Sequence, residues 1–95
     1  MSDRVELIRE CLVRELAPSA LEIADESHRH VGHEGARDGR GHFRVHIVAS
    51  AFAGMPMLAR HRRVYAALGE LMRTDIHALA LDARCPGEVD EKPNA

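Results

Sequence analysis

The stretch Phe43-Arg44-Val45-His46-Ile47 places an aromatic or β-branched residue at every second position. Side chains of a β-strand point alternately to the two faces of a sheet, so this period of two predicts a strand. Residues 21–25 (LEIAD) alternate in the same way and predict a second strand. The two strands can pair as an antiparallel hairpin across the long connection between them.

A helical pattern precedes these strands. The apolar residues Val5, Ile8, Leu12 and Leu16 recur at spacings of three and four, which places them on one helical face. Asp3 fits the N-cap position of that helix. The sequence therefore predicts an amphipathic helix from Asp3 to Leu16.

A second helix and a third strand follow the alternating segments. Pro56 can open the helix, because the first helical position has no intrahelical use for its N–H. Beyond a polar turn, residues 76–81 (IHALAL) predict a short and largely buried strand. We expect one face of the second helix to carry Leu58, His61, Tyr65, Leu68 and Met72.

The order helix, strand, strand, helix, strand predicts an α+β fold. It would contain one three-stranded mixed sheet, with a right-handed helical crossover to the third strand and both helices packed on one face. A chain of 95 residues allows one hydrophobic core, so we expect a single domain over residues 1–84. Residues 85–95 contain little apolar surface and predict a short, flexible tail with at most one helical turn.

Composition narrows the classes of function. Lys and Arg total 13 against 15 acidic residues, a net charge of -2, so any contact with nucleic acid would depend on a local basic patch. Two widely separated cysteines argue against a disulfide scaffold. Without a long apolar segment the sequence predicts no signal peptide and no membrane span, and we expect a cytoplasmic protein.

Histidine is unusually frequent, and three of the seven histidines lie in the glycine-rich connection between the first two strands: His28, His30 and His33. Imidazole binds zinc, copper or iron through either ring nitrogen, and glycines let a loop wrap closely around a metal. The pattern is typical of a metal site. A polar surface loop that merely contains histidines is the alternative interpretation.

His77 is the one imidazole in an otherwise aliphatic strand, on the same side as Leu79 and Leu81 by alternation. A lone histidine in such a setting is more often a structural residue than a ligand. A ligand role for His77 is favoured if the histidine-rich loop lies near this strand, because the loop and the strand would then form one site.

The second helix contains three closely spaced arginines, Arg60, Arg62 and Arg63. Guanidinium groups in such a cluster can contact phosphate or an acidic partner surface, and a solvated helix face is the alternative. The sequence contains neither a G-x-S-x-G nor a phosphate-binding Gly-Lys-Ser/Thr motif. We therefore expect a protein that is not an enzyme.

Taken in order, these motifs resemble the BolA family. The resemblance covers about residues 4 to 83. Five segments carry it: residues 25–30 (DESHRH), 42–45 (HFRV), 52–54 (FAG), 60–65 (RHRRVY) and 76–81 (IHALAL).

The resemblance implies a class II KH-like fold and a heterodimer with a monothiol glutaredoxin. In that family the heterodimer can hold a [2Fe–2S] cluster, with a glutaredoxin cysteine and glutathione on one side. The family's ligand histidine falls on His77. The second ligand falls on His30, with His33 close behind, and the sequence leaves that choice open. His28 and His42 are expected to be structural.

The function implied is that of a cluster partner in iron–sulfur assembly or trafficking, or in iron-dependent regulation. Imidazole in place of thiolate on one iron raises the reduction potential, as in Rieske centres, so such a cluster should be labile or transferable. A DNA-binding transcriptional regulator of the BolA type, using Arg60, Arg62 and Arg63, is the alternative. A zinc or copper site built from the loop alone is a third interpretation.

Overall fold

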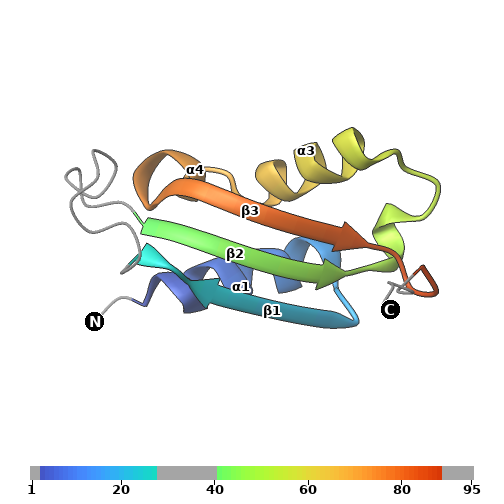
Figure 1. Cartoon of the computed structure of the whole chain (residues 1–95), viewed down its shortest axis with the longest axis horizontal. Coiled ribbons are helices and arrows are strands. Elements are labelled where there is room, and N and C mark those ends of the chain that lie inside the picture. Colours follow the sequence, from blue (N-terminus) through green and yellow to red (C-terminus); the bar gives the residue numbers. More distant parts are fainter. Residues whose placement is uncertain (1–2, 28–40, 89–95) are drawn as a thin grey trace.

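Three strands form one mixed sheet in the order β1-β2-β3. The computed structural model describes residues 3–27 and 41–88 (Figure 1). β1 (Ala20–Asp25) runs antiparallel to β2 (Gly41–Val48), and β2 runs parallel to β3 (Ile76–Arg84). The predicted hairpin and the predicted crossover to a parallel third strand are both confirmed.

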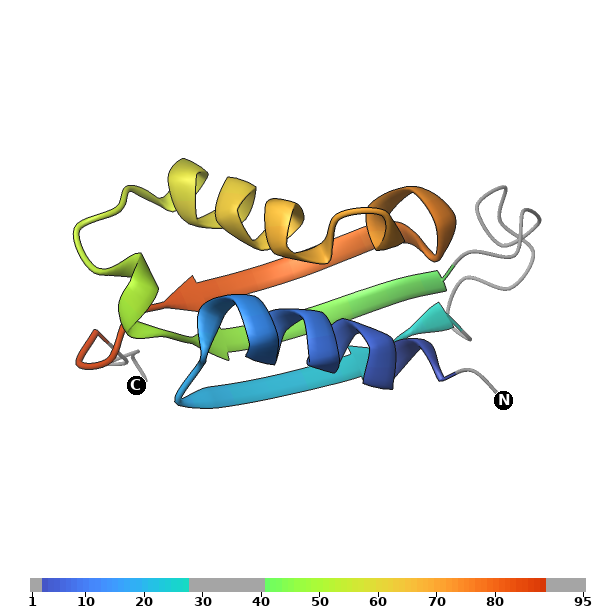
Figure 2. The same cartoon turned by 180° about the vertical axis from the view of Figure 1, so that it is seen from behind.

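The helices cover one face of the sheet and leave the other face open (Figures 1 and 2). α1 (Arg4–Leu16) and α3 (Met57–Leu68) pack side by side on the covered face. The crossover from β2 also includes the short η2 (Ser50–Phe52) and α4 (Leu71–Thr74). The core lies between the helices and the sheet, with Ile8, Leu12, Phe43, Val45, Ile47, Phe52, Val64, Leu68 and Ile76 all buried.

α1 begins and ends where the sequence predicts. The Asp3 side chain accepts a hydrogen bond from the Val5 N–H at 3.0 Å, which satisfies one of the unpaired N–H groups of the first turn. The helix ends at Ala17, which adopts a left-handed conformation with φ of 45°. In the described ranges, no helix is long and apolar enough to cross a membrane.

The second predicted helix differs from expectation in length and in orientation. It ends at Gly69, whose φ of 54° favours glycine, so Met72 belongs to the separate α4. Of the predicted apolar face, Leu68 is buried, but Leu58 is 62% exposed and Tyr65 is 39% exposed. That face was predicted wrongly, because α3 is rotated so that Arg60, Val64 and Leu68 face the core.

β3 is longer than predicted and leads into an ordered turn. It continues to Arg84, and the backbone N–H of Glu88 donates to the Cys85 carbonyl oxygen at 3.1 Å. The Glu88 carboxylate then pairs with Arg60 on α3. The first residues of the predicted tail are therefore attached to the domain, and residues 89–95 lie outside the described residues.

Candidate functional site

Two histidine side chains meet where β2 and β3 begin. The rings of His42 and His77 have centroids 5.1 Å apart and are tilted by 49°. The parallel register is irregular here, since Gly41 pairs with Ile76 but His42 pairs with Ala78. His77 is thus an extra residue in β3, a bulge that breaks the predicted alternation and leaves its side chain exposed.

The ends of the histidine-rich segment are fixed beside this pair. The Ser27 Oγ accepts a hydrogen bond from the His42 N–H at 3.0 Å, and the Glu26 N–H donates to the His42 carbonyl oxygen at 2.8 Å. The Gly41 N–H donates to the Asp75 carbonyl oxygen at 2.9 Å, just before β3. The chain therefore leaves β1 and enters β2 next to His77.

Gly41 is required because two side chains lie close to its backbone. A Cβ atom at this position would lie 2.6 Å from Cε2 of Phe43 and 2.8 Å from the Ser27 Oγ. Glycine thus lets the backbone pass beneath the aromatic ring at the start of β2. The sequence shows the glycine, but the need for it arises from the Phe43 ring on the same strand and from Ser27, which follows β1.

The other predicted loop ligands, His30 and His33, lie outside the described residues, as does His28. Among the residues that are described, no group of three or more His, Cys, Asp or Glu side chains is placed to hold a metal ion. The described part of the site consists of two imidazoles in contact, one of them exposed. This arrangement can supply one or two nitrogen ligands, and a complete metal site would need more.

The predicted arginine cluster separates into two kinds of residue. Arg60 is buried, and its guanidinium forms hydrogen bonds with the carbonyl oxygens of Met55 (2.9 Å) and Ala83 (3.2 Å). It also makes a two-pronged ion pair with the Glu88 carboxylate, at 2.8 and 3.0 Å. The expectation that Arg60 faces solvent is therefore wrong, because its hydrogen-bonding groups face into the fold.

Arg62 and Arg63 are exposed on α3, as predicted. Neither forms an ion pair with an acidic side chain in the part of the chain that the structure describes. α3 itself contains no acidic residue. Its outer side is thus a basic surface available to an acidic or phosphate-bearing partner.

The Arg60–Glu88 pair changes the titration of its neighbours. Hydrogen bonds from the Arg60 guanidinium, and then from Cys85, lower the pKa of the Glu88 carboxyl from 4.5 to about 2. The hydrogen bond from the Cys85 thiol to Glu88 (3.3 Å), together with burial, raises the pKa of the thiol. Cys85 is therefore held as a neutral thiol, and a thiol is a weaker metal ligand than a thiolate.

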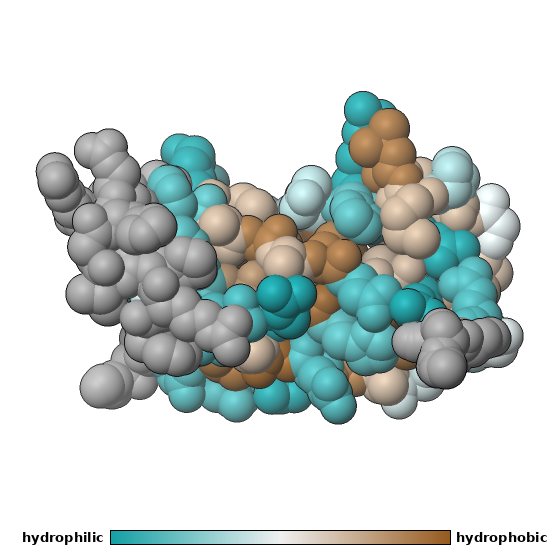
Figure 3. Space-filling view, in the orientation of Figure 1, coloured by the Kyte–Doolittle hydropathy of each residue, from teal (hydrophilic) through white to brown (hydrophobic). Residues whose placement is uncertain are grey.

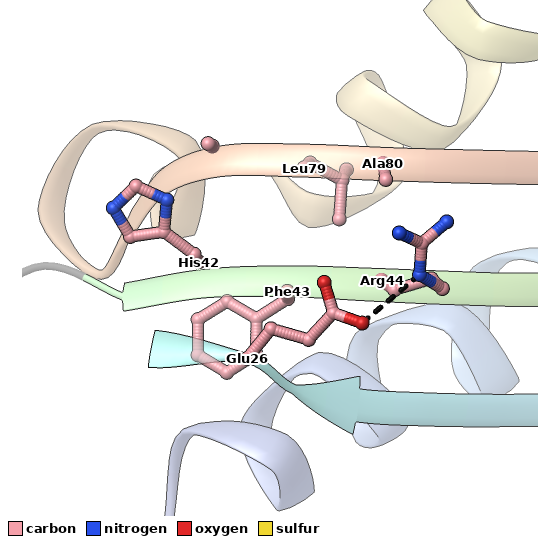
Figure 4. A pocket seen from close by; sticks show the side chains of 7 residues that line it. Glu26, His42, Phe43, Arg44, Leu79 and Ala80 are labelled. Carbon is pink, nitrogen blue, oxygen red and sulfur yellow. Dashed lines mark hydrogen bonds and ion pairs between the residues drawn. The ribbon is translucent and has the colours of Figure 1, made fainter. Parts of the chain in front are cut away.

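A hollow on the open face of the sheet adjoins His42. It has a volume of about 290 Å³. In Figure 4, Glu26 and Arg44 face one another across one side of it, His42 lies at the other end, and Leu79 and Ala80 lie on β3. The residues that line it are Glu26, His42, Phe43, Arg44, Ala78, Leu79 and Ala80.

Sequence reasoning did not single out Arg44 or Glu26. Alternating polar residues on a half-exposed strand have the same pattern whether or not they surround a hollow. The only signal was the pair of small residues Ala78 and Ala80, which leave space above β3. Figure 3 looks onto this open face and shows apolar residues over the sheet between hydrophilic ones.

Comparisons with known proteins agree with one another. A sequence model of the family described as BolA-like protein matches residues 12–88. The chain is 40% identical over 95 residues to "Protein BOLA1, chloroplastic" from Arabidopsis thaliana, which covers 97% of this chain and 59% of that relative. It is 42% identical over 76 residues to "DNA-binding transcriptional regulator BolA" from Escherichia coli, covering 80% of this chain and 70% of the relative.

Solved structures extend the likeness to the fold. The BolA domain of SufE1 from Arabidopsis thaliana superposes with a TM-score of 0.82 and 39% sequence identity, over 94% of this chain and 99% of that domain. The mixed sheet and its two covering helices are therefore shared with a solved relative. Against the longer chloroplast relative, this chain spans about three-fifths of the length.

Proposed function

The chain belongs to the BolA-like family, and from that premise we propose that it is a non-enzymatic partner of a monothiol glutaredoxin. In this proposal the two proteins hold a [2Fe–2S] cluster between them, and His77 is this chain's iron ligand. The cluster would be passed on in iron–sulfur assembly, or would report iron status. The resemblance of the five sequence segments supports this assignment.

One observation carries the proposal: His77 is exposed at a bulge, in ring contact with His42, where β1 and β2 bracket residues 28–40. A buried structural histidine would not be presented to solvent in this way. An exposed imidazole can be reached by a metal centre that a partner carries. His30 or His33 would supply the second ligand from the segment whose ends are fixed here.

The donor set fits the cluster chemically. Nitrogen ligands from this chain and sulfur ligands from a glutaredoxin cysteine and glutathione would give the mixed coordination found in Rieske-type centres. When bound, the cluster supplies one-electron chemistry and transferable iron and sulfide. This chain's residues would orient His77 through contact with His42 and leave the site open on the partner's side.

Reconstitution of iron and sulfide with a monothiol glutaredoxin and glutathione tests the proposal. We expect addition of this protein to convert the spectrum of the glutaredoxin homodimer, in visible absorption and circular dichroism, into that of a different species. The His77→Ala protein should fail to do so. His61→Ala on α3 is the matched control and should behave as the wild type.

Single substitutions His30→Ala and His33→Ala then decide the second ligand. The variant that lacks the ligand should give an altered or unstable cluster spectrum, whereas the other should give the wild-type spectrum. An unchanged spectrum in the His77→Ala protein would reject the assignment of His77. If no new species forms with the wild type, the glutaredoxin partnership itself is wrong for this chain.

A second candidate function is DNA binding by the exposed side of α3. Arg62 and Arg63 are exposed and unopposed by any acid on that helix, and one relative is named as a DNA-binding transcriptional regulator. Phosphate contacts of this kind weaken steeply as salt rises. Duplex DNA binding that falls with salt, and that is lost in the double variant Arg62→Gln/Arg63→Gln, would support it. Binding that survives this double substitution would reject it.

A further inference from the structure

The Arg44 guanidinium forms a hydrogen bond through Nε and presents its two terminal nitrogens to a ligand. Its Nε donates to Oε2 of Glu26 at 3.0 Å, and the side chain is 59% exposed. The two terminal nitrogens make no hydrogen bond within the part of the chain that the structure describes. A guanidinium fixed through Nε presents its remaining edge in a set direction, which suits paired hydrogen bonds to a carboxylate.

The space around Arg44 is large enough for a small peptide group. The hollow of about 290 Å³ lies on one side of the guanidinium, beside Ala78 and Ala80. A second hollow of about 240 Å³, lined by Glu22, Ile23, Ala24, Arg44 and His46, lies on the other side. Small side chains on the neighbouring strands thus leave one hollow on each side of Arg44.

The hollow of about 290 Å³ also lies close to His77, the proposed cluster ligand. His42 lines it, and the His42 ring contacts His77. His42 and Arg44 are two residues apart on the same strand face, roughly 7 Å in an extended chain. The thiol of glutathione is on its middle residue, and the γ-linkage lets the γ-glutamyl carboxylate lie roughly 8 Å from that thiol when extended, a reach comparable with the spacing from His42 to Arg44.

We propose that Arg44 and its hollow receive the γ-glutamyl end of the glutathione that accompanies the cluster. This inference rests on the proposed function, which brings glutathione to the same end of the sheet. The γ-glutamyl end carries a carboxylate next to an ammonium group. The carboxylate complements the open edge of Arg44, and the ammonium complements the Glu26 carboxylate on the same wall.

The contact would make this chain a second binding surface for glutathione. Glutathione would then be held between the two proteins, and not by the glutaredoxin alone. Loss of glutathione from the complex would require separation from Arg44 as well. The heterodimer would therefore retain its cluster at lower glutathione concentrations than it would without this contact.

A titration of the protein alone tests the contact without any cluster. S-methylglutathione is added to the ¹⁵N-labelled full chain while amide chemical shifts are recorded. We expect saturable shifts centred on Arg44, Ala78 and Ala80. Arg44→Gln should weaken the binding about tenfold, since hydrogen bonds to a charged group are lost. Arg62→Gln, which removes an exposed arginine on α3, should leave the affinity unchanged.

A second ligand identifies the end of the peptide that binds. An analogue of S-methylglutathione whose γ-glutamyl α-carboxylate is replaced by an amide should bind the wild type about as weakly as S-methylglutathione binds the Arg44→Gln protein. It should show no further loss with that variant. Equal binding of the two ligands to the wild type, or shifts unaffected by Arg44→Gln, would overturn the proposal.

The experiments distinguish a failure of the glutathione contact from a failure of the glutaredoxin partnership. If the mixed cluster forms with the wild type but S-methylglutathione causes no shifts at Arg44, the glutathione contact is wrong and the glutaredoxin partnership stands. If shifts occur as expected but no mixed cluster forms, the hollow is a peptide-carboxylate site and the partnership is wrong. Thermal unfolding of Arg44→Gln confirms that the variant is folded.

Discussion

At the carboxyl end of β3, Arg60 is buried and Glu88 folds back onto it. At the amino end of β3, His77 is exposed, and so is Arg44 on the neighbouring β2. We call Arg60, Cys85 and Glu88 the closed end, and His42, Arg44 and His77 the open end. Each has an arginine paired with a glutamate. Arg60 uses all three of its nitrogens within the chain, and Arg44 uses one.

The difference separates stability from binding. A guanidinium whose N–H groups are bonded inside the protein stabilises the fold and has little left to offer a ligand. One that is anchored by a single nitrogen contributes little to stability and keeps a directed hydrogen-bonding edge. The same residue type, on the same small sheet, is therefore structural at one end and suited to recognition at the other.

The largest expected effect is at the closed end. Arg60→Met keeps most of the side-chain volume but removes the guanidinium, which leaves two carbonyl oxygens without this donor and the Glu88 carboxylate with the donors of Cys85 alone. Removal of one partner from a buried pair costs 3–5 kcal/mol, and since Glu88 is partly exposed we expect about 3 kcal/mol. Urea unfolding measures the change.

The control for this prediction is two residues away. Arg62→Met changes an exposed arginine on the same helix and should alter the free energy of unfolding by less than about 0.5 kcal/mol. Similar losses from the two variants would mean that Arg60 is no more structural than its neighbour. The contrast between the two ends would then not hold.

The second effect concerns the backbone that positions the open end. In Gly41→Ala the new methyl group would lie 2.6 Å from the Phe43 ring and 2.8 Å from the Ser27 Oγ, so the strand must shift. Overpacking of this kind costs about 1–3 kcal/mol. We expect a lower unfolding midpoint in urea, and altered ring shifts of His42 and His77 in NMR spectra. Gly54→Ala is less suitable as a control, because its φ of 79° adds strain of its own.

An alanine that is already present provides the comparison. Ala24→Gly on β1 removes a methyl group from an exposed position and should leave the two histidine rings unchanged. If Gly41→Ala is tolerated with unchanged stability and unchanged histidine shifts, the close approach at the start of β2 does not constrain the open end.

The third effect is pH dependence at the closed end. The pKa of Glu88 is lowered from 4.5 to about 2, chiefly by the hydrogen bond from Arg60. The stabilisation is thus fully present above pH 4.5, where the carboxylate is ionised in the folded and unfolded chains alike. It is lost as pH falls through 4.5 toward 2, because the unfolded chain binds the proton first.

Glu88→Gln removes this dependence. The difference in unfolding free energy between the wild type and Glu88→Gln should be constant from pH 7 to 5 and should shrink between pH 4.5 and 2. Urea midpoints at a series of pH values give the curve. A difference that stays constant down to pH 2 would show that Arg60 does not hold Glu88 in its ionised form.

Much of this architecture could be predicted from periodicity, and the errors have physical causes. The strands and α1 follow from alternation and from three- and four-residue spacing, which reflect burial on one face. The orientation of α3 was missed because a long side chain such as Arg60 can be buried when its partners come from β3 and from the turn that follows it. Spacing along one helix contains no record of those partners.

The site was predictable only in part for a similar reason. His77 was identifiable through its place in a family motif, and its exposure depends on a register irregularity between two strands. Arg44 and Glu26 are 18 positions apart, and the hollow beside them exists because two alanines lie on a third strand. Such combinations are set by strand pairing, which a single alternating segment does not encode.

The smallest effect expected on stability is at Arg44. Here the comparison of the two ends predicts that a substitution weakens binding but changes the free energy of unfolding little. Arg44→Gln breaks the ion pair with Glu26, but the arginine is 59% exposed, and exposed pairs contribute little to stability. We expect the free energy of unfolding to change by less than about 0.5 kcal/mol, against about 3 kcal/mol for Arg60→Met. A loss at Arg44 as large as that at Arg60 would make it a structural residue, and any weaker glutathione binding in the variant would then follow from damage to the sheet. A small loss, together with weaker binding of S-methylglutathione, would assign the open arginine to recognition because its terminal nitrogens are not needed to hold the fold.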